Sequence, residues 1–256
     1  AFPIAVERLK WLSGFDVQES RARYLALRQL EQTPLTQGEN VLLHWSIAPE
    51  FKGRQGESLA IGHAIFETSS LIQPFVQGCN RMDAIMVPSS FHQEAFQKAG
   101  VHVPIEVIPE GVDTERFTPH GRGLKTVPER FTFLCISQLS YRKGFDLVLK
   151  AFLELFARHD DVQLVLRCYL HDGSDKDRQQ VANFIRVFRE EEMGGLKDGH
   201  IYLLDNIPDV HLPALYRSAH VLLAPFRGEG WGLPIVESLS SEIPVIATHW
   251  GGPATY

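Results

Sequence analysis

The chain has 256 residues, of which 44% are hydrophobic and 22% are charged, which suits one large or two small globular domains. The formal net charge of −6 argues against a nucleic-acid partner bound through its phosphates, and no apolar run approaches the ~20 residues of a membrane span. The three cysteines show no paired spacing, which argues against a disulfide framework or a zinc site and indicates a reducing, cytoplasmic compartment.

Helices and strands are predicted to alternate in the first half of the chain. A capping box at residues 16–19 predicts a helix through Leu30, whose arginine-rich face would meet either solvent or the surface of a membrane. A second capping box, Ser90 to Gln93, predicts the start of another helix. Apolar runs predict strands at 41–45, 84–88 and 105–108, and a helical segment around 71–80.

The second half follows a turn-rich exit at 109–119 and an expected linker at 121–128. Here the alternation is regular, and it predicts a parallel sheet whose ligands bind beyond the carboxyl ends of its strands. The predicted strands are 131–136, 162–170, 200–204, 221–224 and 245–247. The predicted helices are 145–159, 177–192, 213–218 and 234–241.

Residues 227–237 form the stretch with the clearest chemical pattern. Glu229 lies in a glycine-studded loop, and Pro234 suits the start of a helix whose free N–H groups attract an anion. Glu237 follows about one turn into that helix, so both carboxylates can face one ligand. A diphosphate over the helix end, with hydroxyls on both glutamates, describes a nucleotide sugar. Taken alone, the same residues fit an ordinary turn with two solvated glutamates equally well.

The run from Ala219 to Thr248 closely resembles the C-terminal signature of retaining family-4 glycosyltransferases, also called glycosyl transferases group 1. The resemblance implies the α/β fold named GT-B, in which two Rossmann-like, doubly wound parallel-sheet domains face a cleft. We expect residues 1–119 to form a partial acceptor-side domain and residues 120–256 the nucleotide-sugar-binding domain. Both domains are expected to be incomplete, because the chain reads as a fragment that lacks both ends of the family pattern.

The resemblance also implies roles for individual residues. Glu229 would contact the transferred sugar, and Glu237 would hold the ribose hydroxyls of the donor. The residues around the helix start would complete the substrate site: Gly230, Trp231, Gly232 and Leu233. Asn206 and Ile207 stand where the family backbone meets the nucleobase, although a structural role fits them equally well.

The loop after residues 131–136 carries the expected phosphate-binding cations. Lys143 and Gly144 match the family, whereas Arg142 is an added cation and Gln138 replaces the family's arginine. Lys143, with Arg142, would hold the diphosphate and stabilise the leaving group. Because Gln138 is uncharged, either Arg142 compensates, or donor affinity is altered, or the protein has lost activity.

His63, placed with Glu67 in a glycine-rich loop, is the candidate for the cleft-facing residue that the first domain of this family often supplies. It would orient the acceptor or stabilise positive charge on the sugar, and a structural hydrogen-bonded role competes with this interpretation. The tripeptide Asp175-Lys-Asp177 resembles a metal motif of another glycosyltransferase fold, but its place at a helix start favours capping. We therefore expect no metal and no cofactor other than the nucleotide-sugar co-substrate.

The expected activity is retaining transfer of a hexose-type sugar from a nucleoside diphosphate to a carbohydrate or lipid hydroxyl. The alternative is a catalytically inactive GT-B module that binds a nucleotide or acts as a scaffold. An NAD-dependent oxidoreductase would need a Gly-x-Gly-x-x-Gly turn after its first strand, and the sequence has none.

Overall fold

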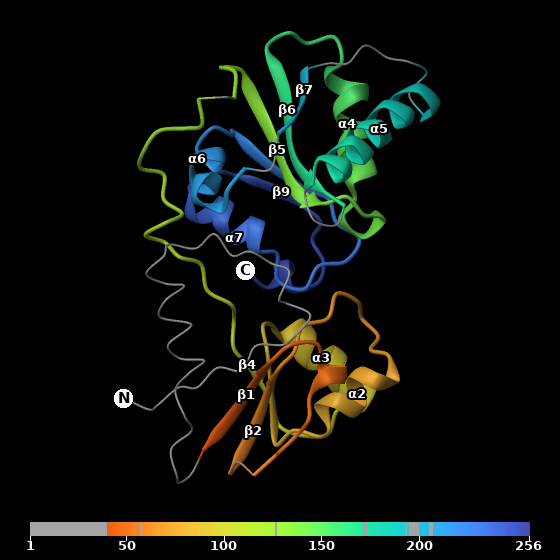
Figure 1. Ribbon diagram of the computed structural model, residues 1–256, viewed down its shortest axis with the longest axis vertical. Helices are drawn as coiled ribbons and strands as arrows, with labels where there is room; N and C mark the ends of the chain where they lie inside the picture. The colour runs from red at the N-terminus through yellow and green to blue at the C-terminus, as the bar shows by residue number, and fades with distance from the viewer. Residues whose placement is uncertain are drawn as a thin grey trace.

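The computed structural model describes residues 40–56, 58–125, 127–170, 174–192, 194, 200–204 and 207–256. The predicted capping box at 16–19 and the basic helix face after it lie outside these ranges. Figure 1 shows two separate sheets at opposite ends of the molecule, joined by the long segment that follows β4.

The first sheet is parallel and has the strand order β1-β2-β3-β4. Its strands are β1 (Val41–Trp45), β2 (Leu59–His63), β3 (Ala84–Val87) and β4 (Ile105–Val107). The chain between them forms a short 3-10 helix, η2 (Ala48–Glu50), and two helices, α2 (Gln73–Cys79) and α3 (Ser90–Ala99). The predicted strands at 41–45, 84–88 and 105–108 and the helix around 71–80 are therefore confirmed.

Two local expectations for this half were wrong. Residues 59–63 were expected in a loop but form β2, where Gly62 is required because a Cβ there would lie 2.4 Å from the Phe51 ring. The helix α3 begins at Ser90 with Ser89 as its N-cap, and the side chain of Gln93 donates to the Ile105 carbonyl at 2.9 Å. The capping box predicted for Ser90 and Gln93 is consequently absent.

The second sheet is also parallel and has the order β7-β6-β5-β8-β9. Its strands are β5 (Phe131–Gln138), β6 (Val162–Tyr169), β7 (His200–Leu203), β8 (Val221–Ala224) and β9 (Val245–Ala247). The helices are α4 (Phe145–Phe156), α5 (Asp175–Glu192), α6 (Leu212–Tyr216) and α7 (Leu233–Ser240). Short 3-10 helices are η3 (Tyr141–Lys143), η4 (Asp209–His211) and η5 (Gly252–Thr255). The predicted alternation is confirmed throughout.

Alternating residues of this sheet supply two buried clusters, one on each face. Leu134 and Val165 pack with α6 and α7, whereas Cys135, Leu164 and Leu166 pack with α4. Phe117, from the segment after β4, packs in the first of these clusters. The boundary predicted near residue 119 stays a prediction.

The strand order places a switch point at β5, which has β6 on one side and β8 on the other. The loops that leave the carboxyl ends of β5 and β8 therefore lie side by side, where open parallel sheets bind ligands. None of the described helices is long and apolar enough to cross a bilayer.

Candidate active site

The loop from β8 to α7 is held in place by its glycines. Gly232 is the N-cap of α7 and has φ +84°, a left-handed conformation that favours glycine. Gly228 and Gly230 lie against the segment after β2. A Cβ on Gly228 would lie 2.4 Å from the Glu67 carbonyl oxygen, and a Cβ on Gly230 would lie 2.3 Å from Ile65 Cγ2. We call this contact zone between the two halves the junction, and it includes the ring contact of Phe91 with Trp250.

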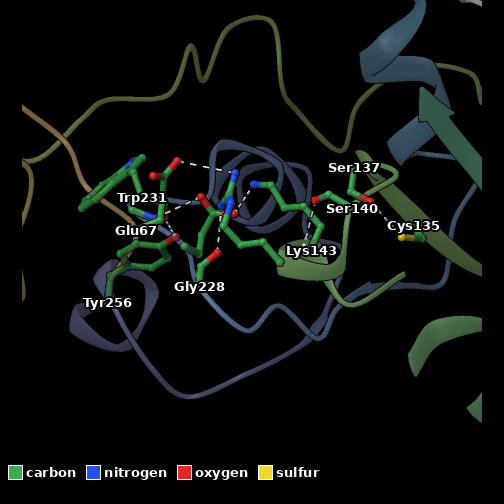
Figure 2. A network of polar contacts seen from close by, with 11 residues as sticks. Glu67, Cys135, Ser137, Ser140, Lys143, Gly228, Trp231 and Tyr256 are labelled. Carbon is green, nitrogen blue, oxygen red and sulfur yellow. Dashed lines mark hydrogen bonds and ion pairs between the residues drawn. The ribbon is translucent and has the colours of Figure 1, made fainter. Parts of the chain in front are cut away.

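The structure brings together two of the residues predicted to be catalytic. Lys143, at the end of η3, donates from Nζ to the Glu229 carboxylate in the neighbouring loop. The side chains are only 21% and 13% exposed, so the two charges interact in a partly dry environment where Coulomb attraction is stronger than in water. Figure 2 shows Lys143 reaching into this network from the side of Ser140, which caps η3.

Arg142 is committed to protein partners on both sides of the junction. One guanidinium nitrogen donates to the Gly228 carbonyl at 2.8 Å, and another lies 3.5 Å from the Glu67 carboxylate. Figure 2 shows Glu67 and Gly228 within the same network. Arg142 therefore lies beside Lys143 in sequence but serves to tie three segments together in this conformation.

Gln138 is not brought to Lys143 or Glu229 within the described part of the chain. Its amide donates to the Leu170 carbonyl at 2.8 Å, just beyond the end of β6. The side chain thus fastens the end of β5 to the end of β6, and its predicted contact with the donor stays a prediction.

Glu237 has a set of partners separate from those of Glu229. Its carboxylate accepts a hydrogen bond of 2.7 Å from the hydroxyl of Tyr216 on α6. Burial raises the pKa of Glu237, while the Tyr216 bond and the charges of Arg116 and Arg167 act in the opposite direction. A buried acid with a raised pKa in a strand-end site is a candidate functional group.

Arg167 connects this acid with the position predicted for the nucleobase. Its guanidinium donates to Asp209 Oδ1 at 3.0 Å and lies 3.4 Å from the carbonyl oxygen of Ile207. Asn206 lies outside the described residues. Sequence reasoning missed Arg167 and Tyr216, although Arg167 lies near the carboxyl end of a predicted strand and could have been noted for that reason.

Nucleotide affinity is expected to fall on acidification at a pH above 4.5, the ordinary pKa of glutamic acid, because Glu237 accepts hydroxyl protons only when ionised. Glu237 is fully ionised at a pH well above its raised pKa, and it loses this charge as the pH falls through that raised pKa. Isothermal titration with nucleoside diphosphates at several pH values measures the effect. Glu237→Gln should remove this acidic limb, whereas the exposed Glu242→Gln should keep it; a limb unchanged in Glu237→Gln would contradict the assignment.

His63 lies at the end of strand β2, not in a loop as expected. The imidazole is only 4% exposed and stacks on the Trp45 ring with a centroid distance of 3.9 Å and an angle of 8°. Its Nε2 lies 3.8 Å from the carboxylate of Glu110, in the segment after β4. Burial lowers the pKa of His63, which favours the neutral ring.

Glu110 connects His63 with the second half of the site. Burial raises the pKa of Glu110, and the negative charge of Glu229 raises it further. The carboxylates of both residues also raise the pKa of the Tyr256 phenol, after the larger effect of burial. Glu110 and Tyr256 therefore both lie near Glu229. Sequence reasoning missed Glu110 because the turn that carries it gave no chemical signal.

The remaining predicted residues, Gly230, Trp231 and Leu233, lie at the end of the β8–α7 loop and the start of α7. Tyr256 donates to the Trp231 carbonyl at 2.5 Å, and the two rings pack at 4.8 Å, as Figure 2 shows. The indole N–H of Trp231 is buried without a partner in the described residues. The amide of Gly230 donates to Glu229 Oε1 at 3.1 Å and so has a protein partner in this conformation. Leu233 is exposed at the start of α7.

No group of three or more His, Cys, Asp or Glu side chains in the described ranges is arranged to hold a metal ion. Asp175 and Asp177 lie in the first turn of α5, where Asp177 accepts from the amide of Leu170 at 2.7 Å. Asp177 therefore fastens the start of α5 to the chain just beyond β6.

Comparison with known proteins agrees with this geometry. The sequence profile described as glycosyl transferases group 1 matches residues 130–256, which contain Lys143, Glu229 and Glu237. Residues 130–256 belong to this family. The family match therefore covers the second sheet and both loops of the switch point.

Several curated relatives are mannosyltransferases by name. A lipopolysaccharide core biosynthesis mannosyltransferase of Rhizobium leguminosarum bv. viciae is 29% identical over 179 residues, covering 68% of this chain and 47% of the relative. A GDP-mannose-dependent α-(1-6)-phosphatidylinositol monomannoside mannosyltransferase of Mycolicibacterium smegmatis is 28% identical over 188 residues, covering 68% and 46%. The chain spans about half the length of such relatives.

The fold matches solved structures over nearly the whole chain. A trehalose-6-phosphate synthase superposes with a TM-score of 0.67 at 15% identity, covering 91% of this chain and 62% of that one. The two parallel sheets and this match confirm the expected GT-B fold.

Proposed function

We propose that this protein moves a hexose-type sugar from a nucleoside diphosphate to a hydroxyl group with retention of configuration. The observation that carries the proposal is the pair formed by Lys143 and Glu229 at the switch point, beside the start of α7. Lys143 and the free N–H groups of α7 would hold the diphosphate and stabilise its charge as it leaves. Glu229 would then turn from Lys143 to the hydroxyls of the sugar.

The leaving phosphate would take the proton of the acceptor hydroxyl on the same face of the sugar. The oxygen of the acceptor forms the new bond to the anomeric carbon while the bond to the phosphate oxygen breaks. In this scheme the protein positions the reactants and stabilises charge, and these two effects can supply most of the rate acceleration. His63, which lies 3.8 Å from Glu110, would face the sugar from the other half.

The donor would be a purine or pyrimidine nucleoside-diphosphate sugar held through its ribose by Glu237. The names of the relatives, one of which is GDP-mannose-dependent, favour a mannosyl donor. We expect turnover without a divalent metal, since Lys143 and the start of α7 supply positive charge to the diphosphate. The acceptor would be a carbohydrate or lipid hydroxyl.

A non-catalytic nucleotide-binding or scaffold module is the second candidate. The observation in its favour is that Gln138 and Arg142 are both bonded to protein groups, while Lys143 is bonded to Glu229. If neither side chain turns toward a diphosphate, binding could persist while turnover is lost.

A donor-hydrolysis assay with UDP-, GDP- and ADP-sugars separates the two candidates. We expect slow release of nucleotide from one donor, unchanged by EDTA, and a loss of about a hundredfold in kcat for Glu229→Gln, because that residue contacts the reacting sugar. Thermal shift measures nucleotide binding in parallel. Stabilisation by a nucleotide without hydrolysis would support the non-catalytic module, and the absence of both would contradict both candidates.

A further inference from the structure

A salt bridge that has no part in the donor scheme joins the two loops of the switch point. Arg227 lies in the β8–α7 loop, two residues before Glu229, and its guanidinium group donates to both carboxylate oxygens of Asp146, at 2.8 and 2.7 Å. Asp146 lies in the first turn of α4, three residues after Lys143. Two parallel bonds between a guanidinium and a carboxylate fix the direction of both side chains.

The same arginine also contacts η3, on the other side of Lys143 in the sequence. Its Nη1 donates to the carbonyl of Tyr141 at 2.7 Å, and its main-chain N–H donates to the carbonyl of Arg142 at 2.7 Å. The Tyr141 ring, which is 76% exposed, lies against the guanidinium group, with the ring centroid 3.8 Å from the central carbon. Arg227 therefore contacts the chain both before and after Lys143.

These contacts restrain the backbones that carry Lys143 and Glu229. A lysine side chain has a long, flexible stem, so its ammonium group can occupy many positions unless the backbone and a partner both restrain it. Glu229 is the partner, since its carboxylate accepts from Lys143 Nζ. Arg227 restrains the backbone, because it bonds to residues on each side of Lys143. A misplacement of about 1 Å in a catalytic pair can lower a rate by about a hundredfold.

The charge of Arg227 is already paired within the protein. Its Nη1 donates to two acceptors and its Nη2 to a third, and both oxygens of Asp146 accept from it. The bond to Arg227 lowers the pKa of Asp146, which favours the ionised carboxylate. A diphosphate would have to displace this carboxylate in order to bind Arg227. The contacts thus favour a role through Lys143 and Glu229 over direct contact with the donor.

We propose that Arg227 is a positioning residue of the transfer reaction: bound to Asp146, it holds Lys143 and Glu229 in the relative position that cleavage of the donor requires. Arg227 acts through these two residues and does not touch the donor. The inference rests on the proposed function, because it assigns Arg227 to that reaction, but the effect of Arg227 on the Lys143 side chain can be measured without turnover.

Arg227→Gln and Asp146→Asn test the proposal from both ends of the salt bridge. The two side chains are 28% and 31% exposed, and a pair this exposed contributes little to stability, so the fold should persist. We expect each variant to lower the kcat of donor hydrolysis about tenfold or more, and to leave the Kd of the nucleoside diphosphate within about threefold. The double variant should be within about twofold of the slower single variant, because both changes break the same contact.

Arg186→Gln is the matched control for these variants. Arg186 also forms an ion pair at 2.7 Å, with Glu190, but both residues lie on α5 and are 53% and 50% exposed. Its kcat and Kd should stay within about twofold of those of the unmodified chain. Isothermal titration gives Kd, and circular dichroism checks the fold of every variant.

Carbon-13 NMR of the chain with dimethylated lysines follows Lys143 directly. Dimethylation keeps the charge and one N–H donor of each lysine, and Lys→Arg variants identify the signals of Lys143 and Lys150. Lys150 is an exposed residue of α4. Arg227→Gln should move the Lys143 signal toward that of Lys150, because the ammonium group is no longer held at Glu229, whereas Arg186→Gln should leave the signal in place.

The outcomes separate this inference from the proposed function. If the unmodified chain hydrolyses a nucleotide sugar and Arg227→Gln keeps its kcat within about twofold, the positioning role is overturned and the proposed function stands. An unmoved Lys143 signal in Arg227→Gln, or a loss of nucleotide affinity in this variant but not in Asp146→Asn, would also overturn it. If no donor is hydrolysed but the Lys143 signal moves, the restraint of Lys143 by Arg227 is supported and the proposed function fails.

Discussion

Turnover of the nucleotide sugar is expected to fall about a hundredfold to a thousandfold when Lys143 is replaced by methionine. The Lys143 ammonium group is the counter-ion of Glu229 and the proposed contact for the leaving diphosphate. Methionine keeps most of the length of the side chain and removes its charge. The loss should appear mainly in kcat, since charge on the leaving phosphate grows as its bond to the sugar breaks.

Lys150→Met is the matched control for this prediction. Lys150 is an exposed residue of α4 that lies 4.0 Å from Glu154, and a surface pair of this kind contributes little. Steady-state kinetics of both variants, with circular dichroism to check the fold, gives the comparison. Equal rates in Lys143→Met and the unmodified chain would remove Lys143 from the reaction.

Gly144→Ala is expected to lower the free energy of unfolding by about 3 kcal/mol. Gly144 has φ +69°, and a Cβ there would lie 1.9 Å from the carbonyl oxygen of Pro225, so the backbones of the β5 and β8 loops must separate. For a chain of this size the change corresponds to a fall of about 8 °C in Tm. The same movement would shift Lys143 away from Glu229.

Gly111→Ala serves as the control, because no heavy atom lies within 4 Å of its added Cβ and its φ is not positive. Thermal unfolding of the two variants, followed by circular dichroism, should show the fall in Gly144→Ala alone. A Tm within 2 °C of the unmodified chain for Gly144→Ala would show that the two loops can part at little cost.

Apolar runs between turn residues were sufficient to predict most of the fold. The strands β8 and β9 begin and end at the predicted residues, because each is a continuous apolar run in a buried parallel sheet. β2 was missed for the opposite reason: Gly62 interrupts its run and has a low strand preference, yet the Phe51 ring packs on it and leaves no room for a side chain.

The candidate site was only partly predictable, because much of it depends on contacts across the fold. Lys143 and Glu229 were identified from their local patterns, and the structure brings them together. The bond from Tyr216 to Glu237 and the stacking of Trp45 on His63 join different elements, so no short pattern contains them. The pairing of Gln138 with the Leu170 carbonyl depends on the lengths of two neighbouring strands.

The contact of Gly228 and Gly230 with the segment at Ile65 and Glu67 also fixes how near the two halves can come. Without side chains on these two glycines, the main chain at Gly228 lies against the main chain of Glu67, and the main chain at Gly230 lies against the Ile65 side chain. A methyl group on either glycine would overlap with the segment after β2 and would force the two halves of the molecule apart. The absence of a Cβ at Gly228 and Gly230 thus sets how closely the loop that carries Glu229 approaches the segment after β2.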